Sequence, residues 1–273
     1  MKHKNISAQS ATLLQYFLQQ DQACFSIEEA RRVFSQSEGG AVKELLSDMT
    51  RRGLLLRLKE GLYCIIPYEK DPDTYFPDWH LVAGYLVGGA SHYIGYYSAL
   101  QLHSLITQPA LREQVVVNRQ FKPTLLTVRN VSFQFIYHNP QHFFGAKSVW
   151  MDAYNKVMCS DVEKTLVDCL FKPDYGGGIT EIAKALFKAK EKVDYEKLLT
   201  YAIQFDSQAV IKRLGFLLEL LEIQTPITEE LHKLRTAATV SLEPSYPAEG
   251  KILSRWSIRR NMDVETITEA LYT

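Results

Sequence analysis

The spacing of apolar residues near the N-terminal end of the chain predicts two helices. Apolar side chains recur with a helical period over residues 11–18, and a polar break ends that run. A second short helix is expected after Ser26, because Glu29 follows at the three-residue spacing of an N-terminal capping box.

A third helix and a hairpin are expected next. The amphipathic run over residues 41–52 ends at Gly53, a residue that commonly follows the last turn of a helix. Two apolar stretches, residues 54–58 and 61–66, then flank a two-residue polar turn and predict a β-hairpin. Three helices followed by a hairpin are typical of a winged helix-turn-helix, which many proteins use to place one helix in the DNA major groove.

Beyond this module the pattern becomes mixed. Residues 67–73 contain two prolines and three acidic residues and predict a linker. After it we expect helices over 79–87, 92–106, 160–170, 181–190, 195–205, 208–223 and 228–236, and strands over 114–118, 131–137, 148–151, 156–159 and 251–258. The expected fold class is α+β, with a winged helix-turn-helix domain over residues 1–70 and a mixed α+β domain over residues 71–273 that ends in helices.

Charge and composition limit the classes of function. The net charge is zero, which argues against a large non-specific nucleic-acid surface. Residues 1–66 carry nine Lys and Arg against seven Asp and Glu, so DNA binding through a few contacts and more than one copy is expected. No apolar run reaches the roughly 18 residues of a membrane span, and no signal peptide is recognised. The four cysteines form no CxxC pair, which favours reduced thiols and a cytoplasmic location.

The third expected helix has the two faces that a recognition helix needs. Its apolar positions form one stripe that would face the core: Val42, Leu45, Leu46 and Met49. Contacts to double-stranded DNA are expected from eight residues of this helix, its N-terminal approach and the hairpin: Ser37, Gly40, Lys43, Ser47, Arg51, Arg52, Arg57 and Lys59. A protein-docking module is the alternative, because positive and negative residues alternate on this helix.

Residue types that carry enzymatic chemistry form no recognised pattern. His138 and His142 have no further ligands at metal-binding spacing and are best explained as polar loop residues. Glycines cluster at residues 84–89 and 176–178 outside any phosphate-binding context. No nucleophile elbow is present. We therefore expect no catalytic residue, no metal and no cofactor.

Four stretches in a fixed order carry a family resemblance: Arg52 to Pro67, Tyr93 to His103, Ser160 to Leu170, and Arg213 to Leu220. Together they resemble the AbiEi family, antitoxins of type IV toxin–antitoxin systems and related winged-helix regulators. The resemblance implies an N-terminal module that represses its own operon at inverted repeats, with two copies side by side. It also implies a C-terminal domain that counteracts a nucleotidyltransferase-like toxin without catalysis of its own.

The same stretches also have structural explanations. Tyr93, Tyr96 and Tyr97 share helical spacing and are expected on a packed core helix. Ser160 or Asp161 is expected to cap the helix that follows. A solvated face is favoured over a partner surface for three residues of that helix: Glu163, Lys164 and Asp168. Arg213 is expected to support packing between the domains.

Two other classes of function are compatible with the sequence. A ligand-responsive winged-helix transcription factor without a toxin partner would need an aromatic pocket, for example one lined by Tyr96, Tyr97 and Trp150. A nuclease or nucleotide-processing enzyme would need a metal-binding carboxylate cluster, and the sequence shows no convincing one.

Overall fold

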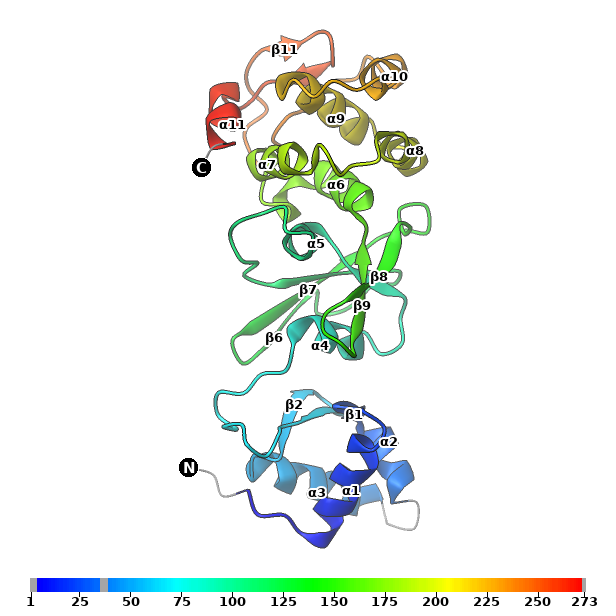
Figure 1. Cartoon of the computed structure of the whole chain (residues 1–273), viewed down its shortest axis with the longest axis vertical. Helices are drawn as coiled ribbons and strands as arrows, with labels where there is room; N and C mark the ends of the chain where they lie inside the picture. The colour runs from blue at the N-terminus through cyan, green and yellow to red at the C-terminus, as the bar shows by residue number, and fades with distance from the viewer. Residues whose placement is uncertain (1–3, 35–38, 272–273) are drawn as a thin grey trace. The chain divides into compact units, whose positions relative to one another are not determined.

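The chain is a mixed α and β protein, as the expected α+β class requires (Figure 1). The computed structural model describes residues 4–34 and 39–271. In this described part, no helix combines the length and the apolar character that crossing a bilayer demands.

The chain divides into two compact units, each with helices and strands. The first unit comprises Met1–Ala90 and Thr127–Val131, and the second comprises Ser91–Leu126 and Ser132–Thr273. The division expected at residue 70 falls before α4, a helix that belongs to the first unit. In the first unit Arg129 donates hydrogen bonds to the carbonyl oxygens of Tyr75, at 2.7 Å, and Pro72, at 2.5 Å.

The first unit contains helices and one small antiparallel sheet. In chain order its elements are α1 (Ala8–Leu18), β1 (Cys24–Ser26), α2 (Ile27–Val33), α3 (Gly39–Arg51), β2 (Leu55–Lys59), β3 (Leu62–Ile65) and α4 (Trp79–Leu86). The strands lie in the order β1-β3-β2, and β3 is antiparallel to both neighbours. The sequence pattern missed β1, because three residues are too short to show a period.

Local signals set the bounds of these elements. The backbone N–H of Glu29 donates to Ser26 Oγ at 3.2 Å, and the N–H of Ser26 donates to the Glu29 carboxylate at 2.7 Å. The expected capping box is therefore confirmed at the start of α2. After α3, Gly53 adopts a φ of 77°, a left-handed conformation that glycine reaches at little cost.

The apolar stripe of α3 forms the core of the first unit together with α1 and the sheet. Val42, Leu46 and Met49 are buried, and Leu45 packs against the same cluster, which confirms the expected stripe. The rings of Phe17 on α1 and Phe25 on β1 stack with their centroids 4.1 Å apart.

The second unit contains a six-stranded mixed sheet, a helical layer and a small C-terminal sheet. Its elements are β4 (His92–Ile94), α5 (Tyr96–Leu102), β5 (Glu113–Val117), β6 (Leu125–Val128), β7 (Val131–Tyr137), β8 (Ala146–Trp150), β9 (Lys156–Ser160), α6 (Val162–Phe171), η1 (Pro173–Tyr175), α7 (Ile179–Ala189), α8 (Tyr195–Phe205), α9 (Gln208–Leu220), α10 (Ile227–Leu234), β10 (Val240–Ser241), β11 (Ile252–Leu253), β12 (Ile258–Arg259) and α11 (Val264–Ala270). The turn between β6 and β7 clusters with the first unit.

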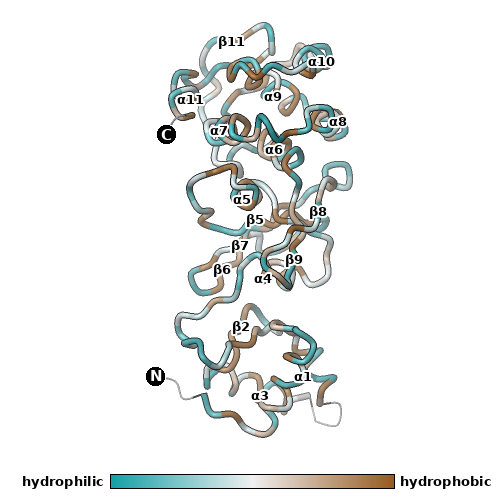
Figure 2. The backbone as a smooth tube through the Cα atoms, in the orientation of Figure 1, coloured by the Kyte–Doolittle hydropathy of each residue, from teal (hydrophilic) through white to brown (hydrophobic). Residues whose placement is uncertain are grey.

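The large sheet has the strand order β6-β7-β5-β4-β9-β8. β5 runs parallel to β7 and antiparallel to β4, and β4 runs parallel to β9. All five residues of β5 are buried, as in strands covered on both faces of a sheet. The hydropathy of each residue along the chain can be followed in Figure 2, where β5 is labelled.

Helix α6 is the centre of the second unit's helical layer. It contacts α5, α7, α8 and α9, and its residues from Glu163 to Leu170 are buried. Arg213 on α9 donates to the carbonyl oxygens of Leu170, at 2.7 Å, and Ser241, at 2.9 Å. Both acceptors belong to the second unit, so the expected role of Arg213 in packing between the domains is wrong. Its guanidinium instead donates a hydrogen bond to a carbonyl at the C-terminal end of α6.

The helix expected over residues 92–106 is instead a strand, β4, followed by α5. The N–H of Gly95 bonds to the carbonyl of Gln114, and Tyr96 adopts a φ of 52°, so the chain turns sharply there. A Cβ at Gly95 would lie 2.7 Å from Val116 Cγ2, which only glycine avoids. Tyr93 therefore lies on a strand, and pairing with β5 overrides its helical spacing.

The C-terminal region also differs in detail from its prediction. The strand expected over residues 251–258 is two short strands, β11 and β12, on either side of a turn that contains Trp256. This indole is 1% exposed and packs on α9 so closely that a Cβ at Gly215 would lie 2.0 Å from its ring. Gly215 is thus a point of close approach within the second unit.

Candidate functional site

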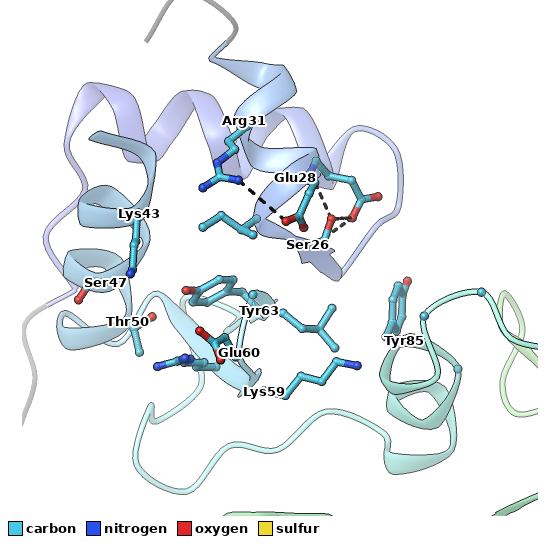
Figure 3. A pocket seen from close by; sticks show the side chains of 18 of the residues that line it. Ser26, Glu28, Arg31, Lys43, Ser47, Thr50, Lys59, Glu60, Tyr63 and Tyr85 are labelled. Carbon is cyan, nitrogen blue, oxygen red and sulfur yellow. Dashed lines mark hydrogen bonds and ion pairs between the residues drawn. The ribbon is translucent and has the colours of Figure 1, made fainter. Parts of the chain in front are cut away.

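A concave surface in the first unit brings together most of the predicted DNA-contacting residues. The cavity has a volume of about 1000 Å³ and is lined by α2, α3, the β2–β3 hairpin and the end of α4. In Figure 3, Lys43, Ser47 and Thr50 project from α3, and Tyr85 projects from α4 on the opposite side. We call this surface the basic groove.

The cationic side chains of the basic groove outnumber its acidic ones. Its positively charged lining residues are Arg31, Lys43, Arg51, Arg57 and Lys59. Its negatively charged ones are Glu28, Glu29 and Glu60. The Glu29 carboxylate is used by the capping box, and Glu28 lies 4.0 Å from Arg31. The remaining positive charge gives the groove the sign that attracts phosphate.

The predicted residues of α3 differ in how available they are. Lys43 and Ser47 are exposed, and so is Gly40 in the first turn, where a Cβ would meet no atom within 4 Å. Arg51 is exposed but forms an ion pair with Asp48 on the same helix. Ser37 lies outside the described residues.

Arg52 has a structural role in addition to its charge. Its guanidinium donates to the carbonyl oxygen of Asn5 at 2.6 Å and to Ser10 Oγ at 3.0 Å, and it lies 2.7 Å from Asp48 Oδ2. These contacts tie the end of α3 to the start of α1. Arg52 directly follows α3, and with three intramolecular partners it is less available than the predicted cations Lys43 and Arg51 of that helix.

The hairpin contributes Arg57 and Lys59, which behave differently. The Arg57 side chain is exposed. Lys59 Nζ donates to the carbonyl of Leu86 at 2.7 Å, so its ammonium is directed to the C-terminal end of α4. The turn itself is held by α2, because the N–H of Ile27 donates to the Gly61 carbonyl at 2.8 Å.

Among the lining residues that sequence reasoning did not predict are Arg31, Tyr63 and Tyr85. Arg31 and Tyr63 come from α2 and β3, and Tyr85 comes from α4. The helical period of α2 could have placed Arg31 on a polar face. Tyr85 could not have been found, because the predicted domain boundary assigned it to the other domain.

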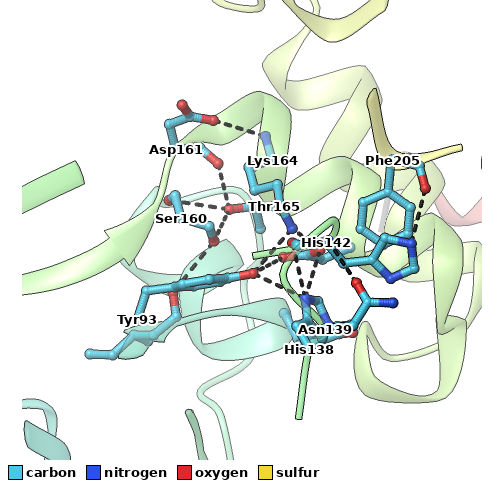
Figure 4. Close-up of polar contacts among 12 residues, drawn as sticks. Tyr93, His138, Asn139, His142, Ser160, Asp161, Lys164, Thr165 and Phe205 are labelled. Carbon is cyan, nitrogen blue, oxygen red and sulfur yellow. Dashed lines mark hydrogen bonds and ion pairs between the residues drawn. The ribbon is translucent and has the colours of Figure 1, made fainter. Parts of the chain in front are cut away.

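A second concentration of ionisable groups lies inside the second unit (Figure 4). Lys164 and Asp168 are fully buried on α6 and form an ion pair. Lys164 Nζ also donates to Tyr93 Oη at 3.1 Å, and Tyr93 Oη donates to Asp168 Oδ2 at 3.1 Å. We call Tyr93, Tyr96, His138, Lys164 and Asp168 the buried polar cluster.

The expected solvated face of this helix is therefore wrong. Its period left Lys164, Asp168 and Glu163 away from the apolar stripe, but α8 and His138, the residue directly after β7, cover that side. Burial lowers the pKa of Lys164 and raises that of Asp168, and their mutual attraction opposes both shifts. Glu163 accepts hydrogen bonds from Lys197 Nζ, at 2.9 Å, and from the backbone N–H of Asp194, at 3.0 Å.

His138 is buried, in contrast to the polar loop residue that was expected. Its Nε2 lies 2.7 Å from Tyr96 Oη, and its Nδ1 lies 3.3 Å from the carbonyl oxygen of His142. A carbonyl only accepts, so we assign the proton to Nδ1 and the accepting lone pair to Nε2. Burial, helped by the charge of Lys164, lowers the pKa of His138 to about 3.

Asp161 caps α6, which settles the choice between Ser160 and Asp161. Its Oδ1 accepts from the N–H of Lys164 at 2.8 Å, and its Oδ2 lies 2.9 Å from Lys197 Nζ. Tyr201 on α8 donates to the same carboxylate at 3.1 Å. The cap and its partners thus join the start of α6 to α8.

The buried polar cluster has the arrangement of a structural network. Its charged members are closed to solvent and satisfy one another, which leaves no accessible reacting group. The described residues include no group of three or more His, Cys, Asp and Glu side chains arranged to hold a metal ion. We therefore assign it to the stability of the second unit.

The aromatic residues proposed for a ligand pocket lie in different places. Tyr96 is buried, whereas Trp150 is 60% exposed on β8, with Lys156 Nζ 3.9 Å from its ring centroid. Tyr97 lines a separate cavity of about 360 Å³ beside Arg112 and Tyr175. The pocket imagined from the sequence does not form from these three residues.

Comparison with known proteins gives a likeness in fold. No family model and no curated protein matches the chain. Among solved structures, it is similar to the RV2827C protein of Mycobacterium tuberculosis, with a TM-score of 0.74 and 14% sequence identity. The match covers 100% of this chain and 97% of that one, so the likeness includes both units.

Removing one member of the buried ion pair is expected to destabilise the protein strongly. Lys164→Met leaves the Asp168 carboxylate buried without its cation, which costs about 3–5 kcal/mol in comparable pairs. The double variant Lys164→Met/Asp168→Leu removes both charges and should recover part of this loss. Urea unfolding of the wild type, both single variants and the double variant measures the coupling, and strictly additive losses would contradict the assignment.

The buried neutral His138 should make stability depend on pH. An unfolded histidine titrates near pH 6.5, whereas the native pKa is about 3, so between these values only the unfolded chain binds the proton. The His138 contribution is fully present above about pH 6.5 and is lost as pH falls, by up to about 1.4 kcal/mol per pH unit. As the pH is lowered from 7.5 to 4.5, the free energy of unfolding should fall more steeply for the wild type than for His138→Gln. Parallel curves for the two proteins would refute this.

Proposed function

We propose that the chain is a DNA-binding transcriptional regulator and that its first unit is a winged helix-turn-helix. The observation that carries the proposal is the basic groove, in which α3 and the β2–β3 hairpin present cations to one concave surface. The order of elements over α1, α2, α3 and the hairpin supports the same assignment. The partner is double-stranded DNA at the operator of the chain's own operon.

In this proposal α3 is the recognition helix. Its apolar stripe is buried, while Lys43 and Ser47 are exposed and can donate to base edges or phosphates. The major groove of B-DNA, about 12 Å wide, admits one α-helix of this kind. Arg57 supplies a phosphate contact next to it, which adds affinity but no sequence information.

The charge balance supports site-directed rather than general binding to DNA. The whole chain has no net charge, so long-range attraction to nucleic acid is weak. Arg51 is partly neutralised by Asp48, and Arg52 and Lys59 have partners within the unit. Lys43 and Arg57 are therefore the predicted cations on which we expect DNA affinity to depend most.

We propose further that the second unit has the antitoxin role of the AbiEi family, against a nucleotidyltransferase-like toxin encoded beside it. Support comes from where the resembling stretches lie. Tyr93 and Tyr96 come from one stretch, Lys164 and Asp168 from another, and Arg213 of a third bonds to the Leu170 carbonyl. The resemblance thus extends to the residues that build the core of the unit.

The DNA-binding proposal predicts a specific loss in a double variant. Lys43→Gln/Arg57→Gln should lower the affinity for the DNA upstream of the chain's own gene by about 10- to 100-fold. Each lost phosphate contact also lowers the number of counterions that the DNA releases on binding. The slope of log K against log salt should become shallower by about 0.9 for each contact. Fluorescence anisotropy at several salt concentrations measures both quantities.

A matched control separates this site from general charge. Arg32→Gln/Lys70→Gln removes the same charge from exposed residues of the first unit that do not line the groove, and should bind like the wild type. Equal losses in both double variants would mean that the groove is not the interface. A wild type with no preference for upstream DNA would overturn the proposed function.

The antitoxin proposal predicts that the two activities separate. Co-expression of the chain with the adjacent nucleotidyltransferase-like protein should restore growth that this protein alone inhibits. The groove variant Lys43→Gln/Arg57→Gln should still restore growth from a heterologous promoter, because its second unit is unchanged. Absence of rescue by the wild type would reject the antitoxin role and leave the regulator role standing.

A further inference from the structure

Helix α1 has one buried stripe and a second, mainly apolar stripe that its own unit covers only in part, since Leu14 is half-buried against the core. Ser10, Leu13 and Phe17 are buried against the core of the first unit. The next stripe has the i, i+3, i+4, i+7 spacing of a helix–helix contact and comprises Ala11, Leu14, Gln15 and Leu18. Leu18 at its end is 56% exposed. A helix with apolar residues on both sides is typical of one that packs on both sides.

This outer stripe forms one wall of an apolar groove of about 560 Å³, which we call the α1 groove. The other wall comes from β3 and the segment after it, including Ile65, Pro67 and Tyr68. Ile6 and Tyr68 at the rim are 42% and 67% exposed. The α1 groove and the basic groove share no lining residue, so both can be occupied together.

The wall opposite α1 is held in place rather than left loose. Lys4 Nζ donates to three backbone carbonyls of this segment, those of Pro67 at 2.6 Å, Tyr68 at 2.8 Å and Lys70 at 2.6 Å. The ammonium also lies 5.6 Å from the centroid of the Tyr68 ring. The groove is therefore preformed, which lowers the conformational cost of filling it.

The charge pattern indicates what fills the groove. From Ala8 to Leu18 the helix has no charged side chain, and Glu69 is the one charged residue among the groove's lining residues. A partner of opposite charge would have little to recognise there. A two-fold axis, in contrast, brings the residues closest to it near their own symmetry mates, where like charges repel and neutral side chains do not.

The polar side chains on α1 suit self-association in the same way. Gln15 lines the groove, and Gln19 follows α1 directly. An amide has both donors and acceptors, so it can bond to the same amide of a second copy. We propose that the α1 groove is the interface at which two copies of this chain form a symmetric dimer, with Leu18 of each copy seated in the groove of the other.

The dimer gives the regulator a second set of DNA contacts, a consequence that rests on the proposed function. The interface leaves the basic groove of each copy open. Two linked modules bind paired half-sites far more tightly than one module binds one, since the second contact is intramolecular. The few cations available in each basic groove are then sufficient.

The mass of the full chain in solution, without DNA, tests the dimer. Sedimentation equilibrium should give twice the chain mass of 31.3 kDa for the wild type. Leu18→Glu places a charge next to its symmetry mate and should weaken the dimer by about 100-fold or more. Gln9→Glu adds the same charge at an exposed position of α1 that does not line the groove, and should leave the dimer intact. A monomeric wild type at about 100 µM, or a dimer that survives Leu18→Glu, would overturn the proposal.

A cross-linking variant keeps the test valid if Leu18→Glu fails to fold. The native cysteines Cys24, Cys64, Cys159 and Cys169 are buried. Leu18→Cys therefore adds a single exposed thiol near the axis, and a short bis-maleimide should join two chains of this variant. Gln9→Cys should not be joined, and equal cross-linking of the two variants would refute the interface.

The proposed dimer and the proposed DNA binding are tested by independent measurements, so either proposal can be rejected without the other. Sedimentation without DNA does not depend on the basic groove, and anisotropy of Lys43→Gln/Arg57→Gln does not depend on the α1 groove. A dimer that does not bind upstream DNA rejects the proposed function alone. A monomer that binds it specifically rejects the dimer alone.

Discussion

The buried pair of Lys164 and Asp168 is the interaction on which the second unit depends. It sits on α6, the helix that contacts four other helices, and it reaches the sheet through Tyr93 on β4. Two charges in the protein interior are tolerable only when each is paired and its remaining hydrogen-bonding groups are satisfied. This requirement fixes the position of α6 against β4 more narrowly than apolar packing would. His138 extends the network to the end of β7, and burial keeps it neutral.

The first unit depends on a different constraint, the division of α3 between a core stripe and an outer face. Val42, Leu46 and Met49 hold the helix on α1 and the sheet, which leaves Lys43 and Ser47 exposed on its other side. Arg52 then fixes the end of the same helix to Asn5 and Ser10. The rigidity of α3 thus comes from side chains that do not line the basic groove.

Local features of this fold could be predicted from the sequence, while contacts between distant residues could not. The capping box at Ser26, the end of α3 at Gly53 and the strand over residues 131–137 depend on near neighbours, and each agrees with its prediction. Lys164 bonds to Tyr93 across 71 positions, and Lys59 bonds to the Leu86 carbonyl across 27. A helical period indicates which side of a helix is polar, but not whether another element covers that side. Lys164 was therefore expected in solvent and Lys59 was expected to contact DNA, whereas both have partners in the fold.

The same reasoning explains why the outer stripe of α1 is informative. On α6 a polar side is covered by its own chain, and every buried charge has a partner. On α1 a mainly apolar side stays partly open, because the described residues of the first unit cover Leu14 only in part and leave Leu18 exposed. The first case lowers the free energy of the isolated chain, and the second leaves apolar surface in water that association would remove. Charged side chains would be the simplest way to keep such a face monomeric, and α1 has none. The absence of charge on an exposed helix is thus itself a property to explain, and a symmetric contact between two copies explains it.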